Sequence, residues 1–139
     1  GIRDTSVTGV QTCALPIFEL ARLAAATAPA AGGAVRFGED PVGIAAAAGG
    51  DVVDRMADDI LGPLDGLAEA DRYSLVETLE VWVEVGGSAS KTAQRLSCHA
   101  NTVRHRLRRF EERTGRRLDR PRDVAALCLA LEALRSRRS

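Results

Sequence analysis

Aromatic residues are scarce in this sequence: one Trp, one Tyr and three Phe make up 4% of its 139 residues. With so few large flat side chains, the core must be aliphatic and rich in Ala, which favours closely packed helices over an aromatic-rich β fold. No apolar run approaches the roughly 18 residues that a membrane-spanning helix needs, so we expect no membrane partner. The composition therefore predicts a mainly α-helical protein.

Cysteine is also sparse, with three residues, Cys13, Cys98 and Cys128, and no Cys-x-x-Cys pair. This set indicates neither a disulfide framework nor a zinc ribbon, and it favours a reducing, cytoplasmic setting. The histidines are not spaced as metal ligands on one helix face. No phosphate-binding loop, nucleophile elbow or paired-carboxylate motif is found, and the Gly-Gly-Asp at 49–51 lacks the Glu-Phe of a nucleotide cyclase loop. We therefore expect no catalytic residue, no metal and no cofactor.

Residues 1–17 read GIRDTSVTGVQTCALPI and show neither a helical nor a strand period. Back-translated, Gly1–Asp4 and Val7–Ile17 resemble a short-read sequencing adapter read in frame, with Thr5-Ser6 as its index. A secretory signal would need an apolar core and a small-residue cleavage site, which this segment lacks. We therefore interpret residues 1–17 as an adapter-derived artefact and expect the natural protein to continue upstream.

Residues 18–66 have the pattern of the end of an α/β domain. The expected elements are helices over residues 18–28, 42–48 and about 52–61, and a short strand over 34–37. Asp51 is a plausible N-cap for the third helix. We interpret this segment as the truncated tail of an upstream α/β domain with a connecting helix.

The chain has no net charge, because 19 Lys and Arg balance 19 Asp and Glu, yet the two signs are separated along it. Residues 38–84 hold twelve acids against two bases, whereas residues 101–122 hold nine arginines against three acids. An isolated charged cluster is usually a solvated helix face. This density of arginine instead points to an anionic partner for the basic half.

Residues 71–139 contain predicted helices joined by short breaks. We expect helices over residues 71–85, 91–96 and 100–114, and a last helix that begins near Pro121. Ser88 or Ser90 can cap the short helix. Ser97–His99 form the turn that follows, and Gly115 ends the long helix. A short helix, a tight turn and a second helix make the helix-turn-helix geometry, with the small Ala93 where the two helices approach.

Apolar residues at helical spacing predict which faces form the core. The expected core positions are Leu75, Leu79 and Trp82 on the first of these helices, Leu96 on the short one, Val103, Leu107, Phe110 and Thr114 on the long one, and Val124, Leu127, Cys128 and Leu131 on the last. The first helix would then pack on the long helix and keep its acids away from the opposite face.

The opposite face of the long helix is polar and basic, as a major-groove reader requires. Arginine pairs with guanine and asparagine with adenine, while other basic and polar groups contact phosphates. The base-reading candidates are Asn101, Arg104, His105 and Arg108, and the phosphate-contacting candidates are His99, Thr102, Arg106, Arg109 and Arg113. The alternatives are a structural helical hairpin and a protein-interaction or dimerisation module whose arginines bind an acidic partner, including residues 38–84 of the chain itself.

The segment TAQRLSCHANTVRHRLRRFEERTGRRL, residues 92–118, resembles the C-terminal helix-turn-helix domain of PucR/CdaR-type bacterial transcriptional regulators. Its specific part is the H-x-N-T-[LV]-x-x-R-L pattern at 99–107. The resemblance covers about residues 71–136, and residues 18–66 are similar in layout to the end of a degenerate GGDEF-like domain. Two residues depart from the family pattern: Ala100, where a basic or polar residue is usual, and His105, where Tyr is common.

This resemblance implies that residues 67–139 are the DNA-binding output domain of a metabolite-responsive regulator. Small-molecule effectors would bind only in upstream domains. Because a single helix-turn-helix reads one half-site, we expect the full-length protein to bind double-stranded DNA as a homodimer.

Overall fold

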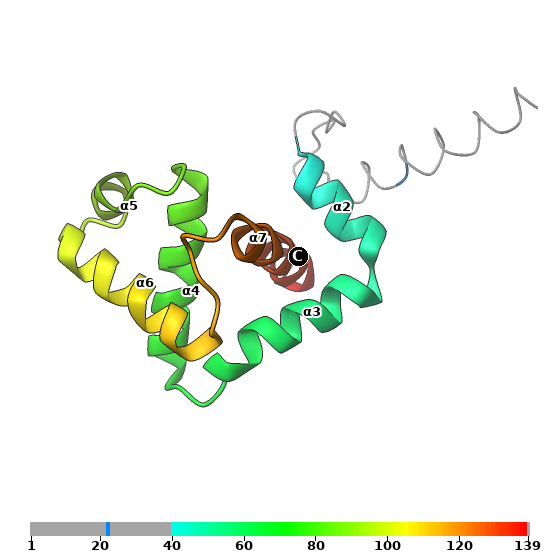
Figure 1. The fold of residues 1–139 in the computed structure, drawn as a ribbon, viewed down its shortest axis with the longest axis horizontal. Coiled ribbons are helices and arrows are strands. Elements are labelled where there is room, and N and C mark those ends of the chain that lie inside the picture. The colour runs from blue at the N-terminus through cyan, green and yellow to red at the C-terminus, as the bar shows by residue number, and fades with distance from the viewer. Residues whose placement is uncertain (1–21, 23–39, 139) are drawn as a thin grey trace, which may run out of the picture. The chain divides into compact units, whose positions relative to one another are not determined.

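Every regular element in the part of the chain that the structure describes is helical. The computed structural model describes Arg22 and residues 40–138. Its elements are α2 (Pro41–Gly49), α3 (Asp51–Leu61), the short 3-10 helix η1 (Gly62–Leu64), α4 (Glu69–Glu84), α5 (Ala89–Arg95), α6 (Ala100–Thr114) and α7 (Pro121–Arg138) (Figure 1). The predicted mainly α-helical fold is confirmed. The helix predicted at 18–28 and the strand predicted at 34–37 lie outside the described residues, and so do residues 1–17.

Helix α2 lies in the first of two units into which the chain divides, Gly1–Gly50 and Asp51–Ser139. Asp40 caps this helix, since its Oδ1 accepts a hydrogen bond from the Gly43 N–H at 2.9 Å. Pro41 occupies the first turn, where a missing N–H leaves no hydrogen bond unmade. The helix predicted over 42–48 is therefore confirmed. Among the described residues, no helix is long and apolar enough to cross a bilayer.

The second unit is built on the packing of α3 against α7. Figure 1 shows α7 nearly end-on, with α3 passing beside it. The buried residues are Val53, Ala57, Ile60 and Leu61 on α3 and Leu127, Ala130, Leu131 and Ala133 on α7. Asp51, predicted as the N-cap of α3, is instead its first residue, where the carboxylate favours the positive end of the helix dipole.

The core face of α7 differs from the predicted stripe. Leu127 and Leu131 are buried as expected, but Val124 and Cys128 are only half-buried. Both side chains line an open groove together with Trp82 and Leu118, which leaves them partly exposed. Burial beside that groove raises the pKa of the Cys128 thiol.

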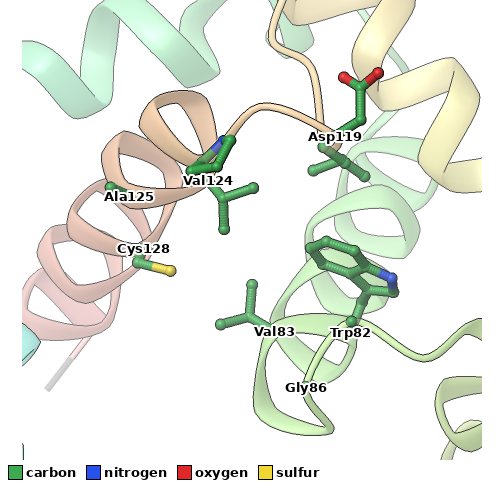
Figure 2. Close-up of a pocket in the computed structure, with 10 residues that line it drawn as sticks. Trp82, Val83, Gly86, Asp119, Val124, Ala125 and Cys128 are labelled. Atoms are coloured by element: carbon green, nitrogen blue, oxygen red, sulfur yellow. The ribbon is translucent and has the colours of Figure 1, made fainter.

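Helix α4 packs against both α5 and α6. Its buried residues are Leu75, Val76, Thr78 and Leu79. Trp82, which we predicted to pack on the long helix, is half-buried and lines the open groove with Pro121 and Val124 (Figure 2). The Gly86-Gly87 turn brings the backbone close to the indole, because a Cβ on Gly87 would lie 3.3 Å from the Trp82 ring. The turn therefore holds Trp82 at the end of α4 beside α7.

Candidate nucleic-acid interface

Helices α5 and α6 form a helix-turn-helix pair with the predicted three-residue turn between Leu96 and α6. Ser88 is the N-cap of α5, and its Oγ accepts a hydrogen bond from the Lys91 N–H at 3.3 Å. Helix α5 therefore begins at Ala89, two residues before the predicted start. Ala93 is buried where the helices meet, as predicted, and its carbonyl accepts a hydrogen bond from the Cys98 N–H at 3.0 Å.

The turn changes the chain direction at Ser97, whose φ is 50°. This left-handed conformation is uncommon for a residue with a Cβ, so the surrounding structure must hold it. His99 then caps α6: its Nδ1 accepts a hydrogen bond from the Asn101 N–H at 3.2 Å. At the other end, Gly115 has a φ of 67° and donates its N–H to the Glu111 carbonyl. Both ends of α6 lie where the sequence predicts them.

The predicted core stripe of α6 is confirmed, because Val103, Leu107 and Phe110 are all buried. Thr114, the last predicted member, is half-buried, and its hydroxyl donates to the Phe110 carbonyl at 2.9 Å. Leu96, expected to face the core, is also half-buried. This apolar face fixes which side of α6 remains in solvent.

The solvent face of α6 carries the four base-reading candidates. Asn101, Arg104, His105 and Arg108 are all exposed. The Arg104 Nη1 donates to the Asn101 Oδ1 at 2.9 Å, which brings an arginine fork and an amide together in the first turns of the helix. Neither Arg104 nor Arg108 has an acidic partner within residues 40–138. This face is therefore positively charged and open to solvent.

The five phosphate-contacting candidates fall into two groups. His99, Thr102 and Arg113 are exposed, and the Nδ1 of His99 is occupied by the helix cap. Arg106 and Arg109 are half-buried and reach α4 instead. The periodic pattern of α6 did not predict the second group, because the α4 residues that these two arginines contact lie far away in the sequence.

Four carboxylates of the acidic half are paired with arginines at the end of α7. The ion pairs are Arg135–Glu84 at 2.7 Å, Arg137–Asp58 at 2.6 Å, Arg137–Asp54 at 3.1 Å and Arg138–Glu80 at 3.7 Å. The hydrogen bond from Arg137 lowers the pKa of the Asp58 carboxyl. These acids are therefore neutralised by α7 and leave the exposed arginines of α6 unpaired with them.

The arginines that follow α6 make local ion pairs. Arg116 lies 3.5 Å from Asp123, and Arg117 lies 3.2 Å from Asp119. Hydrogen bonding to Arg117 lowers the pKa of the Asp119 carboxyl. Arg120 and Arg122 are exposed and have no acidic partner within residues 40–138, so the available positive charge lies both on α6 and on the segment that follows it.

Comparison with known proteins gives matches in this same region. Residues 75–133 match the family described as the PucR C-terminal helix-turn-helix domain. The purine catabolism regulatory protein of Bacillus subtilis is 42% identical over 74 residues, which are 52% of this chain and 14% of that protein. An uncharacterized protein of Mycobacterium tuberculosis is 42% identical over 57 residues, 41% of this chain and 14% of that protein. The chain thus spans about a seventh of the length of these relatives. No solved structure matches it.

Proposed function

We propose that residues 75–133, which match the family of PucR C-terminal helix-turn-helix domains, bind double-stranded DNA sequence-specifically as the output module of a transcription regulator. The recognition helix is α6, which enters the major groove. The observation that supports this proposal is the exposed face of Asn101, Arg104, His105 and Arg108, which has no carboxylate among the residues of its own helix before Glu111. These side chains offer the donors and acceptors that base edges require.

Phosphate contacts complete the proposed interface. The exposed side chains of Thr102 and Arg113 flank the reading face, and the exposed His99 leads into it. Because such contacts displace condensed counterions, they make binding strongly salt-dependent. With ~4–6 phosphates neutralised per protomer by the arginines of the whole interface, log K falls with log salt at a slope of about −4 to −5.

A band-shift titration of the whole chain over 50–200 mM salt tests this function, with a duplex selected from a random-sequence pool as the specific site. We expect affinity to fall by about 10²–10³ over this range. A flat salt response, or no binding at the lowest salt, would contradict the DNA function. Equal affinity for polyglutamate would instead favour the alternative, an arginine-rich helix that binds an acidic protein partner.

Arg104→Ala should weaken binding to the selected duplex by about 1–3 kcal/mol, as expected when a bidentate base contact is lost. It should also relax the preference at one base position, which a second selection with the variant measures. Arg55→Ala is the charge-matched control, since Arg55 is exposed on α3 and has no acidic partner in the described part of the chain. A uniform loss on all duplexes would reassign Arg104 to phosphate.

The natural protein is proposed to act in the bacterial cytoplasm as a homodimer on two half-sites, with centres about 34–36 Å apart. Its small-molecule effector would bind in a part of the protein outside the helix-turn-helix domain. The Bacillus subtilis relative carries the name of a purine catabolism regulator, so a small metabolite is the class of effector that we propose.

A further inference from the structure

Two arginines on α6, the proposed reading helix, contact side chains of α4. Arg106 and Arg109 lie one turn apart, beside the buried residues Val103, Leu107 and Phe110. The Arg109 Nη2 lies 2.9 Å from the Asp71 Oδ2, and the Arg106 Nη1 donates to the Thr78 Oγ1 at 3.3 Å. Asp71 and Thr78 stand two turns apart on α4, so the two contacts are separated along both helices.

The Thr78 contact is made from inside the core. Thr78 is 0% exposed, and its hydroxyl donates to the Ser74 carbonyl at 2.7 Å. That hydrogen bond fixes the hydroxyl proton and leaves the oxygen lone pairs for the Arg106 guanidinium. The buried Thr78 hydroxyl thus both donates and accepts a hydrogen bond, and hydrogen bonds are directional. The apolar packing around it is not directional, so it restricts the sliding and rotation of α6 on α4 less specifically.

We propose that Arg106 and Arg109 are positioning residues, which hold α6 at one rotation and one height on α4 and so aim Asn101, Arg104 and Arg108 at the bases. This inference rests on the proposed DNA function. It changes the role that the sequence suggested for these two arginines, which was contact with phosphate. A phosphate at Arg109 would approach the Asp71 carboxylate, and the repulsion between like charges disfavours that arrangement.

The salt dependence of DNA binding separates the two roles. Arg109→Met keeps most of the apolar stem and removes the charge. If Arg109 positions α6, we expect the slope of log K against log salt to stay at the wild-type value, while the ratio of specific to non-specific affinity falls about fivefold or more. Arg113→Met is the matched control on the same helix, and it should reduce the slope by about 0.9 because an exposed phosphate contact is lost.

Exchanging the charges gives a second readout. Arg109→Asp alone should lower the specificity ratio, and adding Asp71→Arg should restore it to within about threefold of wild type. If Arg109 touched phosphate, the exchanged pair would place a carboxylate against DNA, and binding would stay as weak as in the single variant. At the other contact, Thr78→Ser should keep the ratio and Thr78→Val should lower it, because only serine retains the acceptor.

The outcomes distinguish this inference from the function on which it rests. Two results would overturn the positioning role alone, provided that the wild-type chain binds DNA. One is a reduced slope of log K against log salt in Arg109→Met. The other is a charge exchange that fails to restore specificity although circular dichroism shows a folded chain. Absence of salt-dependent binding by the wild-type chain overturns the DNA function and the positioning role together. An unchanged slope with a reduced specificity ratio supports the inference.

Discussion

Removal of residues 51–66 should abolish the cooperative unfolding transition of the second unit. The deleted segment holds α3 and η1, whose buried side chains cover one side of α7 and reach α6. They are Val53, Ala57, Ile60, Leu61 and Leu64. Burying each of the four larger ones stabilises the fold by about 1.5–3 kcal/mol, so the segment contributes about 6–12 kcal/mol. That is comparable with the whole stability of a domain, roughly 5–15 kcal/mol.

Urea unfolding followed by far-ultraviolet circular dichroism measures this effect. The control is deletion of residues 1–17, which should leave the urea midpoint unchanged if that segment is adapter-derived. A sharp transition in the chain that lacks residues 51–66, at a midpoint close to that of the full chain, would show that α3 is dispensable. The structure leads us to expect a broad, non-cooperative loss of helix signal instead.

The boundary of the second unit shows what a local pattern can and cannot reveal. The sequence assigned residues 18–66 to an upstream remnant and residues 67–139 to the helix-turn-helix domain, whereas the second compact unit begins at Asp51. The spacing of Val53, Ala57 and Ile60 correctly predicts an amphipathic helix. Periodicity does not say which element covers the apolar face, and the partner, α7, comes last in the chain.

Local signals were sufficient for α6. His99 and Gly115 supply start and stop chemistry within one residue of its ends, and the stripe of Val103, Leu107 and Phe110 defines its buried face. The exposed face follows from the buried one, so the exposure of the base-reading candidates could be predicted. Their roles at the DNA stay a proposal.

Contacts between distant residues could not be predicted in the same way. Arg109 and Asp71 are 38 positions apart, and Arg106 and Thr78 are 28 apart. On a helical wheel Arg106 and Arg109 flank the apolar stripe of α6, and nothing in the local sequence distinguishes them from arginines that face solvent. Trp82 is a second case: its spacing on α4 predicts a core position, whereas the side chain is half-buried and lines the groove beside α7.

Phe110→Ala should lower the free energy of unfolding by about 3–5 kcal/mol. Phe110 is 0% exposed and is the largest of the fully buried side chains in the described part of the chain. Its truncation removes apolar contacts and leaves a cavity on the face of α6 opposite the reading residues. The expected loss is thus a large share of the stability of the whole unit.

Tyr73→Ala is the matched control, because Tyr73 is an aromatic residue that is 58% exposed on α4. Its hydroxyl makes only an exposed hydrogen bond to Glu77 at 3.4 Å, so we expect a loss below about 1 kcal/mol. Urea denaturation of both variants supplies the comparison. Similar losses would mean that Phe110 does not anchor α6. A loss confined to Phe110→Ala would show that this buried aromatic side chain anchors the face of α6 opposite the reading residues. The apparent DNA affinity of the variant should then scale with the fraction of chain that remains folded.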